Sequence, residues 1–146
     1  MKNLDKTEIK ELSFLQIDTP NYSKLVKDFT EEDKKIFPLS INPHFYRNIE
    51  SLYLIKRKEI VFGFIYTLNK KIIEEENSFK EVGIYIYPAY RNAGIGKKAI
   101  LCFKKIKSSF ILHVAKDNSV MYRMMTENSE FAIVHNTPER LICKVV

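Results

Sequence analysis

One segment of the chain reads Val82-Gly83-Ile84-Tyr85-Ile86-Tyr87-Pro88-Ala89-Tyr90-Arg91-Asn92-Ala93-Gly94-Ile95-Gly96-Lys97-Lys98. Its first half is almost continuously apolar, as expected for a strand buried on both faces, and Pro88 ends that strand. Gly94 and Gly96 then stand where the spacing of apolar residues predicts the start of a helix. Backbone N–H groups at a helix N-terminus have no intrahelical partner, and the helix dipole favours negative charge there. Because glycine has no Cβ to hold a ligand away, the segment predicts an anion site, with the charges of Arg91 and Lys97 beside it.

Two common phosphate-binding patterns describe this turn poorly. The P-loop requires glycine at position 91 and serine or threonine at position 98, where the chain has Arg91 and Lys98. The dinucleotide-binding fingerprint is matched by two glycines and by Ala99 at its third small position. However, this strand-helix-strand unit comes late in the chain, after strands predicted to be antiparallel, and the next strand ends at Ala115, which is not acidic.

A third pattern, Q/R-x-x-G-x-G/A, is matched by Arg91-Asn92-Ala93-Gly94-Ile95-Gly96. The chain therefore resembles the GNAT superfamily of acyl-CoA-dependent N-acyltransferases. The strand end Ile84-Tyr85-Ile86-Tyr87-Pro88-Ala89-Tyr90 also looks like the one that precedes the signature in that superfamily. The order of elements is similar over all 146 residues, and the detailed match covers about residues 81–131. The resemblance implies an enzyme that moves the acetyl group of acetyl-CoA to a primary amine by direct attack in a ternary complex, with acetyl-CoA as cosubstrate and no metal.

The resemblance also implies how coenzyme A binds. In the superfamily the backbone amides of the signature hold the pyrophosphate; here these are the amides of Asn92, Ala93, Gly94, Ile95, Gly96 and Lys97, next to Arg91. The pantetheine arm pairs with the preceding strand, which here means Ile84, Tyr85 and Ile86. Because that pairing needs a free edge, the strand is expected to splay from the strand predicted over residues 110–115. Asn118 caps the next helix, contacts the pantetheine arm, or does both.

The catalytic positions match the superfamily less closely. Many relatives place a tyrosine seven residues after the position of Asn118, as general acid for the departing thiolate, and this chain has Met125 there. Tyr122, about one helical turn earlier, is the candidate acid, with a packing role as the alternative. Glu81 stands where many relatives carry an acidic residue that acts as base through water. Its alternative is a strand-end carboxylate paired with neighbouring lysines.

Outward from this segment, hydrophobic periodicity predicts one α/β domain over residues 1–146. Strands are expected over residues 8–17, 52–56, 60–68, 79–87, 110–115, 131–134 and 141–146, and helices over 20–29, 30–37, 94–107 and 119–127. Residues 42–51 are interpreted as helical or irregular, and residues 70–78 as a charged connection between strands. The order is β-α-α-β-β-β-α-β-α-β-β, which corresponds to a GNAT-like mixed sheet with central strands splayed around the CoA site. The strand-helix-strand passage predicts one parallel pair.

The composition limits which cellular compartment and which binding partners are expected. The chain is 45% hydrophobic and 29% charged, as a folded soluble domain is, and no apolar run reaches the roughly 18 residues that span a bilayer. The first residues lack the apolar core of a secretory signal, and Cys102 and Cys143 form neither a disulfide framework nor a zinc cluster. These features predict a cytoplasmic protein. The net charge of +6 predicts an anionic partner, for which nucleic acid, a membrane surface and a phosphorylated cofactor are the candidates.

Two other functions stay open at this point. Met125 at the usual acid position motivates a coenzyme A-binding module without turnover, and the net charge motivates a basic nucleic-acid-binding domain. The chain lacks a helix-turn-helix pattern, aromatic-basic interleaving and a zinc knuckle, and its helices lack the aromatic-rich face of a membrane-surface helix. Neither nucleic acid nor membrane is therefore expected as a partner. The acceptor amine, whether a small molecule or a protein, is not identified by the sequence, and both a monomer and a homodimer are open.

Overall fold

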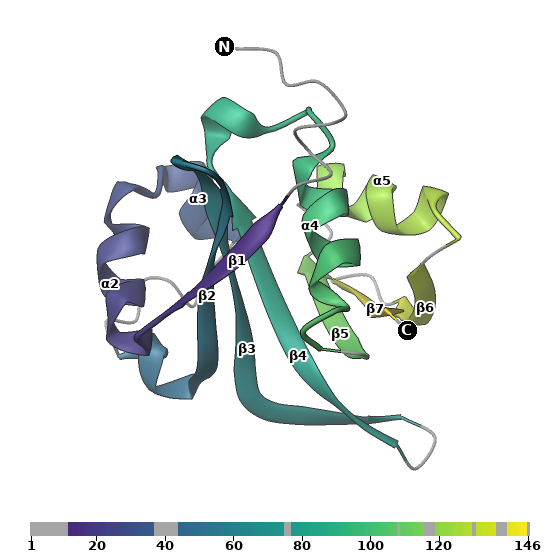
Figure 1. Ribbon diagram of the computed structural model, residues 1–146. Helices are drawn as coiled ribbons and strands as arrows, with labels where there is room; N and C mark the ends of the chain where they lie inside the picture. The colour runs from purple at the N-terminus through teal and green to yellow at the C-terminus, as the bar shows by residue number, and fades with distance from the viewer. Residues whose placement is uncertain are drawn as a thin grey trace.

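The structure, a computed structural model, describes residues 12–36, 44–74, 77–107, 109–115, 119–129, 131–136 and 140–145. One mixed sheet is formed by the strands β1 (Ser13–Ile17), β2 (Ile49–Arg57), β3 (Ile60–Glu74), β4 (Asn77–Ile86), β5 (Phe110–Ala115), β6 (Phe131–Asn136) and β7 (Arg140–Val145). The α-helices in this part of the chain are α2 (Tyr22–Leu25), α3 (Glu31–Ile36), α4 (Ile95–Phe103) and α5 (Ser119–Glu127). In Figure 1, α2 and α3 lie on one side of the sheet, and α4 and α5 lie on the other.

The strands follow the order β1-β2-β3-β4-β5-β7-β6 across the sheet. The neighbours β4 and β5 are parallel, and every other neighbouring pair is antiparallel. This confirms the predicted mixed sheet, the predicted order of elements and the parallel pair on either side of α4. The predicted strand over residues 110–115 and the predicted helix over residues 119–127 have the same bounds as β5 and α5.

Several predicted elements differ in extent. The prediction of a charged connection over residues 70–78 is wrong for the described residues: β3 continues to Glu74, β4 begins at Asn77, and the two strands pair antiparallel up to these ends. β-branched Ile72 and Ile73 favour the extended conformation, and a register shift after Thr67 lets the pairing resume at Lys71.

The predicted helix over residues 20–29 is a succession of short turns: η1 (Thr19–Asn21), α2 and η2 (Val26–Asp28). The stretch 42–51, interpreted as helical or irregular, contains η4 (Phe45–Asn48), and β2 starts directly after it. β1 begins at Ser13, and residues 8–11 of the predicted first strand lie outside the described residues. Residues 37–43, which include Pro38 at the predicted end of the second helix, also lie outside them.

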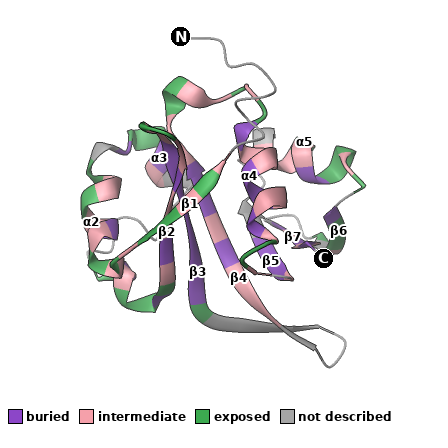
Figure 2. Ribbon diagram, viewed as in Figure 1, coloured by how far each residue is buried: buried purple, intermediate pink, exposed green. Residues whose placement is uncertain are grey.

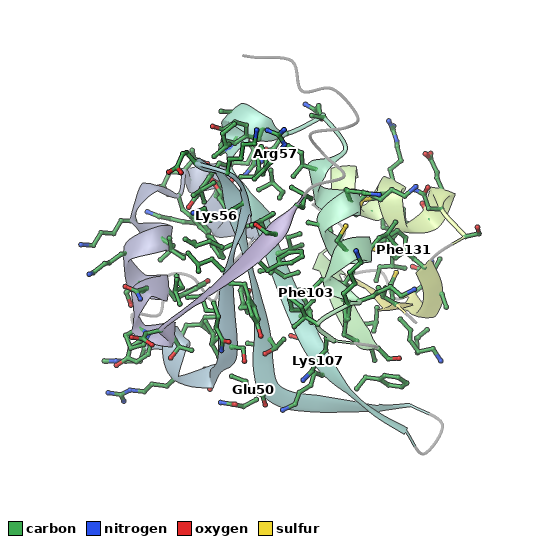
Figure 3. All side chains as sticks on the ribbon, viewed as in Figure 1. Glu50, Lys56, Arg57, Phe103, Lys107 and Phe131 are labelled. Atoms are coloured by element: carbon green, nitrogen blue, oxygen red, sulfur yellow. The ribbon has the colours of Figure 1, made fainter. Side chains whose placement is uncertain are left out.

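Each face of the sheet carries its own apolar core. Under α4 and α5 the core contains Phe103, which is fully buried and whose ring meets those of Phe14, Tyr53 and Phe110 edge to face. Figure 3 labels Phe103 between α4 and the sheet. Under α2 and α3 the core is mainly aromatic, and its members include Tyr22, Phe29, Phe45, Phe64, Tyr66 and Tyr85. Figure 2 shows the buried residues concentrated along the central strands and the inner side of α4.

β4 contributes to both cores because successive side chains of a strand point to opposite faces. Val82 and Ile84 belong to the core under α4, and Tyr85 belongs to the aromatic core on the other face. Gly83 lies between them, and a Cβ there would stand 2.3 Å from the Tyr66 ring. The Tyr66 ring therefore covers the strand at Gly83, and position 83 has no room for a side chain.

Candidate active site

A gap opens between β4 and β5. Their parallel pairing consists of Lys80 with Phe110, Glu81 with Ile111 and Val82 with Leu112, whereas β4 continues to Ile86 and β5 to Ala115. The two strands therefore separate after Val82 and Leu112, as the resemblance predicts. Because the strands stay in the same sheet through their paired ends, the gap is a wedge that opens toward the C-terminal ends of both strands.

An ion-pair cluster around Glu50, at the start of β2, lies at the end of the gap where β4 and β5 are still paired. Its carboxylate accepts a hydrogen bond from the Lys80 ammonium and lies 3.7 Å from the Lys107 ammonium. The hydrogen bond from Lys80, together with the charge of Lys107, holds the pKa of Glu50 below its usual value. Figure 3 labels Glu50 and Lys107 near the same end of the sheet. The cluster ties β2 and β4 to the segment after α4, and so keeps the wedge closed at this end.

The open edge of β4 presents backbone groups to the gap. Tyr87 donates its N–H to the Phe62 carbonyl oxygen at 2.8 Å, just beyond the pairing of β3 and β4. Antiparallel strands alternate between residues whose backbone groups face the partner and residues whose groups face away. In this register Tyr85 directs its backbone groups to β3, and Ile84 and Ile86 direct theirs to the gap. Of the three residues predicted to pair with pantetheine, Ile84 and Ile86 thus have the required backbone orientation.

The glycine turn lies at the mouth of α4, directly after this edge. Gly94, the residue before the helix, has φ +79°, and Asn92 has φ 66°, a left-handed conformation that asparagine tolerates. The Lys98 N–H donates to the Gly94 carbonyl oxygen, so the amides of residues 95–97 belong to the first turn, which has no intrahelical acceptors for them. A Cβ at Gly96 would have Ile86 Cγ1 as its nearest neighbour, at 3.7 Å. The protein's own atoms therefore leave room for a side chain at position 96.

The Arg91 side chain does not point along the turn. Its Nε donates to the Ile86 carbonyl oxygen at 2.8 Å, and its Nη2 donates to Asp33 Oδ1 at 3.2 Å. The guanidinium carbon lies 5.1 Å from the centre of the Tyr85 ring. Arg91, predicted to lie beside the phosphates, is thus engaged by the strand end and by α3. Lys97 donates to Asn128 Oδ1 at 2.7 Å, which connects the start of α4 to the residue after α5.

The candidate catalytic residues come from different elements. Tyr122 on α5 is half-buried and packs against the core under α4, and Met125 on the same regular helix is fully buried in that core. Glu81 is half-buried and lies one residue before the end of the β4–β5 pairing. The pKa of Tyr66 is raised by burial above all, and also by Tyr22 and by the charge of Glu81. Asn118 lies outside the described residues.

A small aromatic cleft opens on the α2 side of β4. Its volume is about 190 Å³, and it is lined by Lys24, Leu25, Phe29, Tyr85, Tyr87 and Pro88. Tyr85 lies near the end of β4 that borders the gap, and Tyr87 directly follows that strand, so the cleft and the gap adjoin the same strand end. The rings of Phe29 and Tyr85 stack with their centres 4.3 Å apart. The cleft thus places an apolar, partly basic surface next to the gap.

Asp33 is the main site residue that the sequence reasoning missed. It is 2% exposed, and it accepts hydrogen bonds from the Tyr85 hydroxyl at 2.7 Å and from Arg91. Burial alone would raise its pKa, but the hydrogen bonds from Tyr85, the Thr30 amide and Arg91 outweigh burial and lower it. The one local signal was the helix start at Thr30, which identifies Asp33 as a helix-capping residue and carries no information about its distant partners.

Two further findings concern alternative kinds of site. Within the described residues, no group of three or more histidine, cysteine, aspartate or glutamate side chains is placed to hold a metal ion. None of the helices in this part of the chain has the length and apolar character needed to cross a bilayer.

The chain shares its fold with solved acetyltransferases. It resembles an aminoglycoside N(6′)-acetyltransferase from Legionella pneumophila with a TM-score of 0.72 and 12% identity, over 99% of this chain and 93% of that one. The microcin C7 self-immunity acetyltransferase MccE, solved with acetyl-CoA and AMP, has a TM-score of 0.63 and 15% identity, with 93% and 92% covered. The PaiA N-acetyltransferase from Thermoplasma acidophilum, solved with coenzyme A, has a TM-score of 0.59 and 16% identity, with 92% and 98% covered.

No protein-family model matches the chain, and no curated protein matches it in sequence. At identities this low the structural likeness establishes the fold. The fold is that of the GNAT acetyltransferases, with a single open mixed sheet.

Proposed function

We propose that the protein is an acetyl-CoA-dependent N-acetyltransferase that acts on a primary amine. The observation that carries the proposal is the separation of β4 from β5 after Val82 and Leu112, directly beside the glycine turn of α4. The gap supplies a strand edge for an extended amide-containing chain, and the turn supplies amides for phosphates. Coenzyme A contains both parts in one molecule. Solved proteins with this fold hold coenzyme A or acetyl-CoA, which supports the same ligand here.

In this proposal the cosubstrate lies along the open edge of β4. The pyrophosphate accepts hydrogen bonds from the backbone amides of residues 92–97, and the positive end of the α4 dipole favours its charge. The pantetheine amides pair with the backbone of Ile84 and with the N–H of Ile86, whose carbonyl oxygen already accepts from Arg91. The thioester then lies near the end of β4, where an N–H directed into the gap can stabilise an oxyanion.

The chemical step needs a neutral amine and a leaving thiolate. The amine nitrogen attacks the thioester carbon, and collapse of the tetrahedral intermediate breaks the carbon–sulfur bond. Glu81 accepts the amine proton through water, because strand alternation places its side chain on the same face of β4 as Tyr85, which lines the cleft. Tyr122 on α5 donates a proton to the thiolate; a water molecule is the alternative donor, since a thiolate leaves with little help. Met125 is a buried thioether and carries no proton that it could donate.

The acceptor amine enters from the aromatic cleft. The cleft borders the part of β4 that faces the gap, and Phe29, Tyr85 and Tyr87 provide a surface on which the carbon skeleton of an amine can rest. Aromatic faces also attract cations, so the cleft can receive the acceptor as an ammonium before it is deprotonated.

The deciding experiment is a thermal unfolding series with acetyl-CoA, coenzyme A and ATP. At a ligand concentration about 100-fold above Kd, binding adds about 2.7 kcal/mol to the free energy of unfolding, and Tm should rise by several degrees. The expected result is a shift with acetyl-CoA and coenzyme A and none with ATP. Absence of a shift with both CoA species would reject the proposal.

A second candidate, a coenzyme A-binding module without turnover, is favoured by the buried Met125 at the usual acid position. It predicts the same thermal shift, so turnover separates the two. Release of free thiol from acetyl-CoA in the presence of a panel of amines, followed with a thiol reagent, would reject the module. Binding without thiol release for any amine in the panel would favour it.

A further inference from the structure

Asp33 is a buried carboxylate that joins α3 to both halves of the proposed site. Its Oδ2 accepts from the Thr30 backbone N–H at 3.1 Å and from the Tyr85 hydroxyl at 2.7 Å, and its Oδ1 accepts from Arg91 Nη2 at 3.2 Å. The Thr30 hydroxyl oxygen in turn accepts from the Asp33 backbone N–H at 3.0 Å, which completes a reciprocal cap at the start of α3. The carboxylate is therefore held in place by the helix that carries it.

Arg91 passes this restraint on to the open strand edge. Its Nη2 is bound to Asp33, and its Nε donates to the Ile86 carbonyl oxygen, which is directed into the gap. The guanidinium also lies against the Tyr85 ring. The backbone of Arg91 begins the turn that leads into α4. One guanidinium thus fixes the end of β4, the wall of the cleft and the first residue of the glycine turn relative to one another.

We propose that Asp33 is a positioning residue for coenzyme A. Through Arg91 it holds the Ile86 backbone and the phosphate-binding turn in their binding geometry, and through Tyr85 it holds the wall of the acceptor cleft. The inference rests on the proposed function, because it presupposes that the gap and the turn bind coenzyme A. It assigns Arg91 an indirect role, in which its side chain shapes the site and does not contact the pyrophosphate.

The indirect role and direct phosphate contact by Arg91 predict opposite results for Asp33→Asn. The asparagine side chain has nearly the same shape as aspartate but no charge. Arg91 therefore loses its buried counter-ion, which is the interaction that holds its side chain at the strand end. If Arg91 acts by positioning, releasing it loosens the turn and weakens binding. If Arg91 is a phosphate ligand, releasing it from Asp33 makes its charge available and leaves binding unchanged or tighter.

The test measures coenzyme A binding by isothermal titration calorimetry for wild type, Asp33→Asn, Arg91→Met and the double variant. We expect each single variant to raise Kd about tenfold, the effect typical of losing a hydrogen bond to a charged group. The double variant should raise it no further, since both changes break the same connection. Wild-type or tighter binding by Asp33→Asn, or additive losses in the double variant, would overturn the inference.

Controls separate positioning from lost stability and from failure of the proposed function. Val145→Ala trims the core at the end of the sheet where β4 and β5 stay paired, away from the gap. It should lower Tm and leave the Kd of coenzyme A unchanged. If Asp33→Asn does not fold, Arg91→Lys serves instead, because lysine keeps the charge but cannot bridge Asp33 and Ile86; it too should bind about tenfold more weakly. Wild-type affinity in Arg91→Lys would overturn the inference, whereas lack of binding by the wild type itself would reject the proposed function.

Discussion

Val82 on β4 and Leu112 on β5 are the last paired residues of two parallel strands that both continue beyond them. A parallel pair buried in the middle of a sheet normally keeps its hydrogen bonds, because unpaired backbone groups are costly when buried. Here the separation leaves the backbone of Ile84 and Ile86 directed into the gap, and Arg91 binds the carbonyl oxygen of Ile86. This edge of β4, which none of the described strands pairs beyond Val82, is the structural feature on which the proposed coenzyme A site rests.

The two glycines of the turn should respond differently to substitution by alanine. Gly94→Ala places a Cβ on a residue with φ +79°, which costs about 1 kcal/mol of folding free energy even though the space around it is open. Gly96→Ala introduces a Cβ at ordinary contact distance from Ile86 within the first turn of α4, and should leave stability unchanged or raise it by up to about 1 kcal/mol.

The ligand, however, approaches Gly96 closely in the proposed complex. Gly96→Ala should therefore weaken coenzyme A binding by about tenfold or more while Tm is retained. Urea denaturation and calorimetric titration on the same preparations measure both quantities. Wild-type affinity in Gly96→Ala would show that the glycine keeps no space for the ligand.

Glu81→Gln tests the proposed base. The variant should reduce kcat about 100-fold near neutral pH, because the glutamine cannot accept the amine proton. The loss should become smaller as the pH approaches the pKa of the acceptor amine, since free neutral amine is then abundant. The measurement is a pH profile of kcat for both proteins. Glu127→Gln, which removes an exposed carboxylate paired with Arg123 on α5, is the matched control and should follow the wild-type profile. A Glu81→Gln profile parallel to that of the wild type would exclude Glu81 from the mechanism.

Tyr122→Phe tests the proposed acid. Loss of the hydroxyl should lower kcat by about 100-fold or more and leave the KM of acetyl-CoA nearly unchanged, because the proton is needed only as the thiolate departs. An unchanged kcat would assign Tyr122 to packing and leave protonation of the thiolate to water.

Met125→Tyr provides the complementary experiment. Met125 is 1% exposed within the core under α4, so a tyrosine there overfills the core and should cost about 1–3 kcal/mol of stability. No rate increase is expected, since the new hydroxyl cannot reach the gap from the core. A faster variant with wild-type Tm would show that position 125 faces the thioester after all.

The aromatic core should make the protein sensitive to alkali. Burial raises the pKa of the Tyr22 hydroxyl from 10.0 to about 12, against a smaller lowering by its hydrogen bond with Tyr66. Between these values an unfolded tyrosine has lost its proton and the folded one retains it, so the unfolded state binds fewer protons and stability falls as pH rises. Below pH 10 both states are protonated and the contribution is fully present.

Tyr22→Phe should remove this component. At pH 8 the variant is expected to be less stable than wild type by about 1–3 kcal/mol, because the Tyr66 hydroxyl loses a buried partner. The difference should shrink as pH rises from about 10 to about 12. Urea midpoints of both proteins over this pH range measure it. Parallel stability curves would show that Tyr22 ionises equally in both states.

Local sequence signals were sufficient to predict most of the helices and strands and the glycine turn before α4. Three signals depend only on residues close together in the chain: the apolar run up to Ile86, the proline after it, and the spacing of Gly94 and Gly96. Each of them therefore predicts one local structure. β5 and α5 were predicted with their observed bounds for the same reason. The interpretation of residues 70–78 as a connection was wrong because charge suggested a loop, whereas cross-strand pairing, a non-local interaction, extends β3 to Glu74 and lets β4 begin at Asn77.

The amino-acid sequence by itself determined the order of elements, the strand stop and the glycine-containing helix start, since propensity, hydrophobic period and backbone freedom are properties of neighbouring residues. Tertiary structure alone decided which way the Arg91 side chain turns, because its partner Asp33 is 58 positions away and is brought to it by the packing of α3 against β4. It also decided that Met125 faces the core and that Tyr85 joins the cleft to Asp33. Contacts between distant residues depend on how whole elements pack, and no local pattern encodes that packing.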